Sequence, residues 1–156
     1  MKGRSAVVVL LVGLAVSGLA WARDLALVSN KANTVSGLAL ADLTKVCKAE
    51  TSRWPDGKLV TVVMRKPSLG DMKLVLEKIY GASESEVSQL IAAANHGRVN
   101  HPAIVVVGTD EEVMYQVSGT PGAVGFVDVY SINSSVAVLK VGGRLPLEPG
   151  YVLHGN

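Results

Sequence analysis

The segment that most constrains the fold is residues 60–71. An apolar, β-branched run ends on Arg65, and a Pro-Ser-Leu-Gly loop then opens an amphipathic helix at Met72. A strand that leads through a glycine loop into a helix N-terminus can cradle an anion, and an arginine can hold an oxyanion through two parallel hydrogen bonds. An ordinary strand-to-helix turn with a solvated arginine has the same pattern, and on this segment alone it is the simpler interpretation.

The first 22 residues read as an export signal. Lys2 and Arg4 precede an apolar run over 6–20, and Ala20-Trp21-Ala22 has the small–x–small pattern of a signal-peptidase site. We therefore expect cleavage after Ala22, a mature domain over 23–156, and a periplasmic or secreted location. The alternative is an uncleaved anchor, because the apolar stretch is just long enough to span a bilayer.

Charge and cysteine content narrow the function classes. Lys2 and Arg4 account for the whole net charge of +2, so the mature chain is balanced and has no electrostatic footprint for nucleic acid. Cys47 is the only cysteine, which excludes an internal disulfide, and we expect it to be a small buried hydrophobe.

The pattern of apolar residues predicts one α/β domain. We expect strands over 24–29, 59–64, 103–107, 123–130 and 136–141, and an extended tail over 145–153. We expect helices over 38–48, with Leu40, Leu43 and Cys47 inward, and over 72–80, ended by Gly81. Two further helices begin at capping boxes, at 83–86 and 109–112. This alternation predicts a layered sheet flanked by helices.

The residues with reactive side chains form no enzyme signature. His96 and His101 flank a polar loop without a neighbouring carboxylate or thiol, and His154 lies where the chain end is expected to fray. The acidic cluster at 110–112 is most simply a helix N-terminus that satisfies its own dipole. We therefore expect no enzyme, no metal site and no cofactor.

Taken in order, four segments resemble the phosphate ABC-transporter substrate-binding proteins, within the type 2 periplasmic binding-protein fold. They are 25–30 leading to 40–43, 54–57 with the strand ending at Arg65, 71–81, and 120–126 with the later turn at 143–146. The resemblance implies an α/β, single periplasmic-binding-protein-like lobe with a mixed sheet flanked by helices. Family members have two lobes that close on the anion, and residues 23–156 have room for one.

The resemblance also implies a ligand loop made of Arg65, Ser68, Gly70 and Asp71. The family pattern resembles Arg-x-x-x-Ser-Gly-Thr, in which Arg65 and Gly70 match while Leu69 and Asp71 replace the two hydroxyl residues. Ser68 lies one position early. A carboxylate at Asp71 would repel an anion, and we expect it to cap its own helix and to pair with Arg65.

Two function classes remain open from the sequence. The first is an exported, non-enzymatic solute-binding or accessory module of the cell envelope, with a small oxyanion such as phosphate as ligand. The second is an interaction or structural protein that kept the fold and lost the anion site. Its partner would be an envelope protein or a second copy of the chain.

Overall fold

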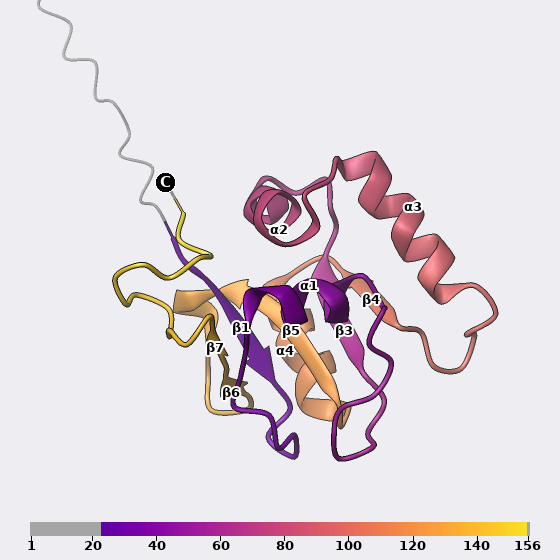
Figure 1. The fold of residues 1–156 in the computed structure, drawn as a ribbon, viewed down its shortest axis with the longest axis horizontal. Helices are drawn as coiled ribbons and strands as arrows, with labels where there is room; N and C mark the ends of the chain where they lie inside the picture. Colours follow the sequence, from indigo (N-terminus) through magenta and orange to yellow (C-terminus); the bar gives the residue numbers. More distant parts are fainter. Residues whose placement is uncertain (1–22, 156) are drawn as a thin grey trace, which may run out of the picture.

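The computed structural model describes residues 23–155 and gives them a mixed five-stranded sheet (Figure 1). Along the chain its strands are β1 (Leu25–Ser29), β3 (Thr61–Arg65), β4 (Ile104–Val107), β5 (Ala123–Asp128) and β6 (Ala137–Val138). Their order in space is β4-β3-β5-β1-β6. β3 pairs parallel with β4 and β5, whereas β1 pairs antiparallel with β5 and β6. The expected α/β class with a mixed sheet is confirmed.

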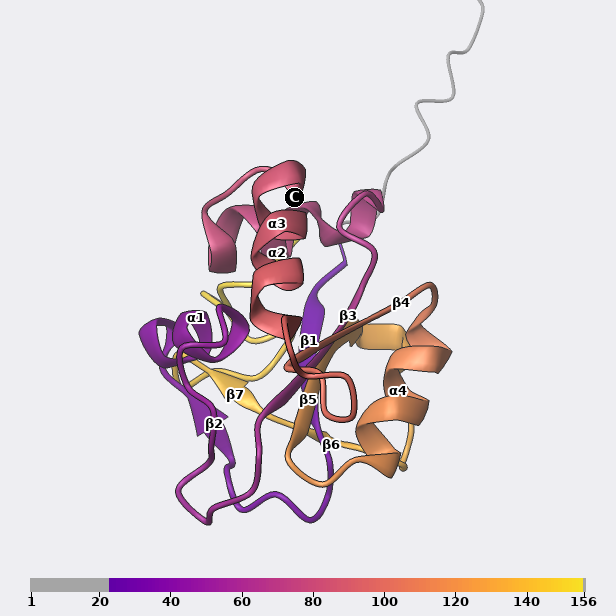
Figure 2. The same cartoon turned by 90° about the vertical axis from the view of Figure 1, so that its right-hand side faces the viewer.

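Helices cover both faces of this sheet. They are α1 (Leu40–Cys47), the continuous run η1 (Gly70–Met72), α2 (Lys73–Val75) and η2 (Leu76–Tyr80), then α3 (Glu84–Asn95) and α4 (Asp110–Gly119). Figure 2 shows α4 alone on one side of the sheet, with α1, α2 and α3 on the other. Both expected capping boxes are present, at Ser83–Glu86 and at Thr109–Glu112.

The two faces of the sheet carry different cores because side chains alternate along each strand. Val62 and Met64 of β3 and Phe126 of β5 point into the larger core, beneath α1, η2 and α3. Val63 points into the smaller core, beneath α4. Gly125 lies on that smaller side, where an added Cβ would be 2.7 Å from Val113 Cγ1. The absence of a side chain at this position allows α4 to approach the sheet closely.

Several elements differ from the sequence prediction. The helix over 72–80 begins as a 3-10 turn at Gly70 and ends as a π turn, in which the Gly81 N–H bonds the Leu76 carbonyl with Gly81 in the left-handed region. Leu40 is 36% exposed rather than inward. It is the first residue of α1, where the helix is not yet packed on the sheet.

The expected strand over 136–141 is also divided. β6 joins the main sheet, whereas β7 (Lys140–Val141) pairs parallel with β2 (Gly37–Leu38), a short strand that the sequence did not predict. Leu139, the residue between β6 and β7, is buried in the core. The chain therefore passes from the main sheet to the two-stranded sheet at this residue.

The tail over 145–153 is a series of turns rather than an extended segment. Tyr151 and Leu153 are buried, and the Leu25 N–H donates to the Leu153 carbonyl at 3.0 Å. The expected fraying of His154 is wrong, because its Nδ1 lies 2.6 Å from Oδ1 of buried Asp24. The start and the end of the described chain therefore lie side by side (Figure 1). The proposed signal segment, residues 1–22, lies outside the described residues.

Candidate functional site

Arg65 is the last residue of β3 and lies at the carboxyl edge of the parallel strands. Its side chain points to the α4 side, as alternation from Val63 requires, and the residue is only 6% exposed. The carboxyl edge of parallel strands is where α/β folds usually bind ligands. A buried guanidinium needs compensating charge, because an isolated charge is costly to remove from water.

That compensation comes from two carboxylates. Arg65 Nη1 donates to Asp71 Oδ2 at 2.9 Å, and Arg65 Nε lies 3.0 Å from Asp110 Oδ1. The Asp71 side chain is 74% exposed and the Asp110 side chain 10% exposed, so water screens the first pair much more than the second. The contact between Arg65 Nε and Asp110 Oδ1 is an ion pair without hydrogen-bond geometry, and Arg65 Nη2 also has no hydrogen-bond partner among the described residues.

Asp110 is held in place by further polar contacts. Its Oδ2 accepts a hydrogen bond from the Ser131 hydroxyl at 2.8 Å and one from the Asp128 N–H at 3.3 Å. The carboxylate therefore links the end of β3, the start of α4 and the end of β5. The sequence interpretation of Asp110 as a plain first-turn acid missed this role. Its local pattern carries no signal for Arg65, because only the strand order brings the two residues together.

The loop over 66–71 places its expected site residues differently. Ser68, Gly70 and Asp71 are exposed, and the N–H groups of Leu69 and Met72 bond to carbonyls within the loop. The predicted pairing of Asp71 with Arg65 is present. The prediction that Asp71 caps its helix is wrong: η1 starts after Leu69 and has no side-chain cap, and the Asp71 carboxylate turns to the guanidinium instead.

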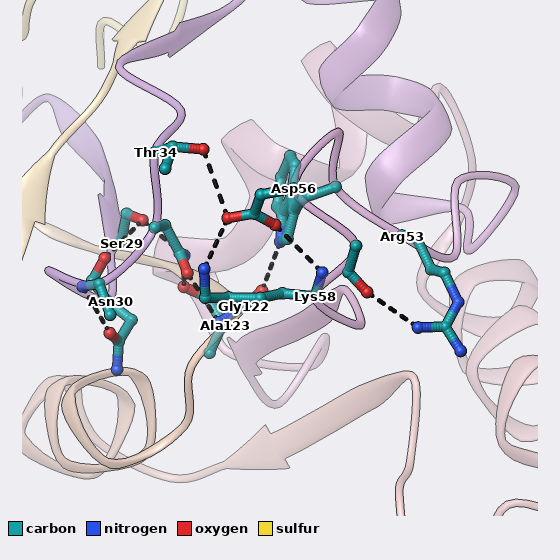
Figure 3. Close-up of polar contacts among 12 residues, drawn as sticks. Ser29, Asn30, Thr34, Arg53, Asp56, Lys58, Gly122 and Ala123 are labelled. Carbon is teal, nitrogen blue, oxygen red and sulfur yellow. Dashed lines mark hydrogen bonds and ion pairs between the residues drawn. The ribbon is translucent and has the colours of Figure 1, made fainter.

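A second polar cluster lies at the opposite edge of the sheet (Figure 3). The Asn33 amide donates to the Ala123 carbonyl at 3.1 Å and accepts from the Gly122 N–H at 2.7 Å. The Trp54 indole N–H donates to the Gly122 carbonyl at 2.7 Å. The Asn30 amide donates to two carbonyls at the end of α4. These groups bond to the backbone of the protein itself, so the cluster joins loops to β5 rather than presenting free donors.

Cys47 is a free cysteine and is buried in the core. Burial raises the pKa of the Cys47 thiol far above its ordinary value, which keeps it protonated and unreactive, as expected for a small buried hydrophobe. Within residues 23–155 no three His, Cys, Asp or Glu side chains gather as a metal site. No helix formed by those residues has the length and apolarity needed to cross a membrane.

Searches by sequence give no match: neither a family model nor a curated protein resembles this chain closely enough to be detected. Solved structures do match. An ABC-type phosphate transport receptor from Vibrio cholerae aligns with a TM-score of 0.69 and 21% identity, over 86% of this chain and 54% of that chain. PstS from Borrelia burgdorferi aligns at 0.66 and 16%, over 86% and 55%. A phosphate-binding protein from Stenotrophomonas maltophilia aligns at 0.60 and 17%, over 80% and 40%.

These structural matches establish the fold. The chain has the α/β architecture of a single lobe of a periplasmic binding protein, as the sequence resemblance implied. It spans about half the length of the solved structures that it matches. The matched proteins are named as phosphate receptors or binding proteins.

Proposed function

We propose that this chain is a non-enzymatic domain of the phosphate-binding-protein type, which acts in the cell envelope as a solute-binding or accessory module. The observation that carries this proposal is the fold itself, shared with phosphate-binding proteins over most of the chain, together with a buried arginine at the carboxyl edge of β3. A guanidinium in that position is a natural partner for an oxyanion such as phosphate.

The export signal belongs to the same proposal. Residues 1–22 would direct the chain across the membrane, and cleavage after Ala22 would release one domain that starts at Arg23. N-terminal sequencing of the protein from its native host tests this. A soluble fraction that begins at Arg23 is expected, whereas full-length protein in the membrane pellet would contradict release.

A second candidate function is an interaction protein that kept the fold and lost the anion site. The ion pairs of Arg65 favour it. Asp71 and Asp110 bring two negative charges to one positive charge. The cluster therefore carries a net negative charge before any ligand binds. An added phosphate would have to displace Asp71 from Arg65 and would meet the repulsion of both carboxylates.

Calorimetric titration with phosphate and sulfate separates the two functions. Because the guanidinium is already paired, we expect wild-type affinity in the millimolar range or below detection. A micromolar or tighter isotherm that Arg65→Ala abolishes would support solute binding by the wild-type loop. Flat isotherms, together with a stable dimer in sedimentation or a defined envelope partner, would support the interaction protein.

A further inference from the structure

A hollow of about 680 Å³ lies at the edge of the sheet opposite Arg65. It is formed between the turn that precedes β3 and the loop that joins α3 to β4. Its polar lining residues are Ser52, Arg53, Arg98, Asn100 and His101. No Asp or Glu side chain lines it in the part of the chain that the structure describes, although acidic and basic residues are balanced over 23–156.

Arg53 is fixed in position at one wall. It forms a β-bridge with Leu59, and its Nη1 donates to the Gly57 carbonyl at 2.8 Å. The buried Trp54 beside it anchors the turn to β5 through the indole bond to Gly122. Figure 3 shows the Arg53 guanidinium directed away from the Asp56–Lys58 pair. A guanidinium has five N–H donors, so this single bond leaves donors for a ligand.

The nearby carboxylate of Asp56 is paired with Lys58 rather than with Arg53. Lys58 Nζ lies 2.6 Å from Asp56 Oδ2, and this hydrogen bond is the main reason that the pKa of Asp56 falls below its ordinary value. Asp56 therefore remains an anion paired with Lys58. The positive charge of Arg53 has no such partner among the described carboxylates.

The opposite wall is also held by contacts at its base. The Asn95 amide pairs with both backbone groups of Ile104, at 2.8 and 3.0 Å, and so closes the loop that carries Arg98. The Arg98 N–H donates to the Asn95 carbonyl at 3.0 Å. The His101 ring lies 3.4 Å from the hydroxyl of buried Thr61, at the start of β3. Arg53, Arg98 and His101 therefore line the same hollow, on walls that these contacts hold in place.

We propose that this hollow binds a phosphate-type oxyanion between Arg53 and Arg98, at a site separate from the Arg65 loop. Two arginines without facing carboxylates provide the charge-assisted, forked donors that tetrahedral oxyanions prefer. Leu59 and Val99, which is 92% exposed, add apolar surface at the rim. This surface could contact the organic group of a phosphate monoester, and it leaves room for free phosphate.

Backbone amide shifts in an NMR titration of the folded domain test the proposal at low ionic strength, where exposed charges are least screened. The probes are inorganic phosphate and phenyl phosphate, with chloride as the ionic-strength control. Saturable shifts confined to residues 52–53 and 97–101 are expected. Tighter binding of phenyl phosphate would assign the site to monoesters, and equal binding would assign it to free phosphate.

Three variants complete the test. Arg98→Gln should weaken binding about tenfold or more, and adding Arg53→Gln should abolish it. Arg144→Gln removes an equivalent exposed charge outside the hollow and should change nothing. Shifts that persist in the double variant, or that never saturate at these residues, would overturn the proposal. Shifts at residues 65–71 alone would overturn it while supporting anion binding by the Arg65 loop, so the two sites fail independently.

Discussion

The two faces of the sheet are closed by different physical means. Large apolar side chains such as Phe126 and Met64 fill the face beneath α1, η2 and α3. The α4 face has a smaller core, rich in valine and alanine, and it ends at the Arg65–Asp110 ion pair. A close-packed apolar core offers an oxyanion no polar partner, whereas a charged cluster at a sheet edge can exchange partners. Any ligand chemistry of the Arg65 loop therefore depends on the packing of the α4 face, because Asp110 at the start of α4 holds the guanidinium.

Phe126→Ala should give the largest loss, because it removes the largest fully buried side chain. Truncation of a buried phenylalanine costs about 3–5 kcal/mol, much of the stability of a domain. Chemical denaturation should show this loss, and Tyr130→Ala, at an exposed position, should be near neutral. Wild-type stability of Phe126→Ala would mean that the larger core is not the main support of the fold.

Asp110→Ala should produce a loss of about 3 kcal/mol on the other face, because it leaves the Arg65 guanidinium buried with only the exposed Asp71 as partner. The double variant Arg65→Met with Asp110→Ala should recover part of that loss, since no unpaired charge remains. A double variant less stable than Asp110→Ala would show that Arg65 contributes packing rather than charge.

Gly125→Ala should cost about 1–3 kcal/mol, because its Cβ would meet Val113, Val117 and the Val63 carbonyl beneath α4. Gly119→Ala is the matched control, since nothing lies within 4 Å of its added Cβ. Thermal melts of both variants test how closely α4 packs. Equal melting temperatures would contradict the tight approach of α4 to β5.

The smallest stability change is expected for Asp71→Thr, because the Asp71 side chain is solvent-exposed. Combining it with Leu69→Ser adds a packing cost, since Leu69 is partly buried against the larger core. We expect this change to restore the family-like Arg-x-x-x-Ser-Gly-Thr order and to remove a repelling charge. If the loop is a degenerate anion site, calorimetry should then detect stronger oxyanion binding than in wild type, and adding Arg65→Ala should abolish that gain. Tight phosphate binding by wild type that the double change weakens would refute the role of Asp71 as a blocker.

Features set by a few neighbouring residues could be predicted from the sequence. The two capping boxes and the end of the helix at Gly81 follow from bonds and dihedral angles within one turn. Within the candidate site, the pairing of Arg65 with Asp71 could also be predicted, since both residues lie in one short loop.

Features that join distant segments could not be read in this way. The split of the strand over 136–141 depends on which strands are nearby, and the pairing of His154 with Asp24 depends on the meeting of the two chain ends. The arginine hollow likewise joins the turn before β3 to the loop after α3.

The sequence by itself determined the α/β class, the two helix starts at capping boxes and the presence of an arginine at the end of a buried strand. Only the tertiary structure decided that this arginine has a second, buried partner in Asp110. The parallel pairing of β3 with β4 and β5 brings Asp110 to Arg65, and burial makes the pair energetically important. The physical reason is that propensities and caps act over one turn of chain, whereas charge compensation acts between whichever groups the packed core excludes from water.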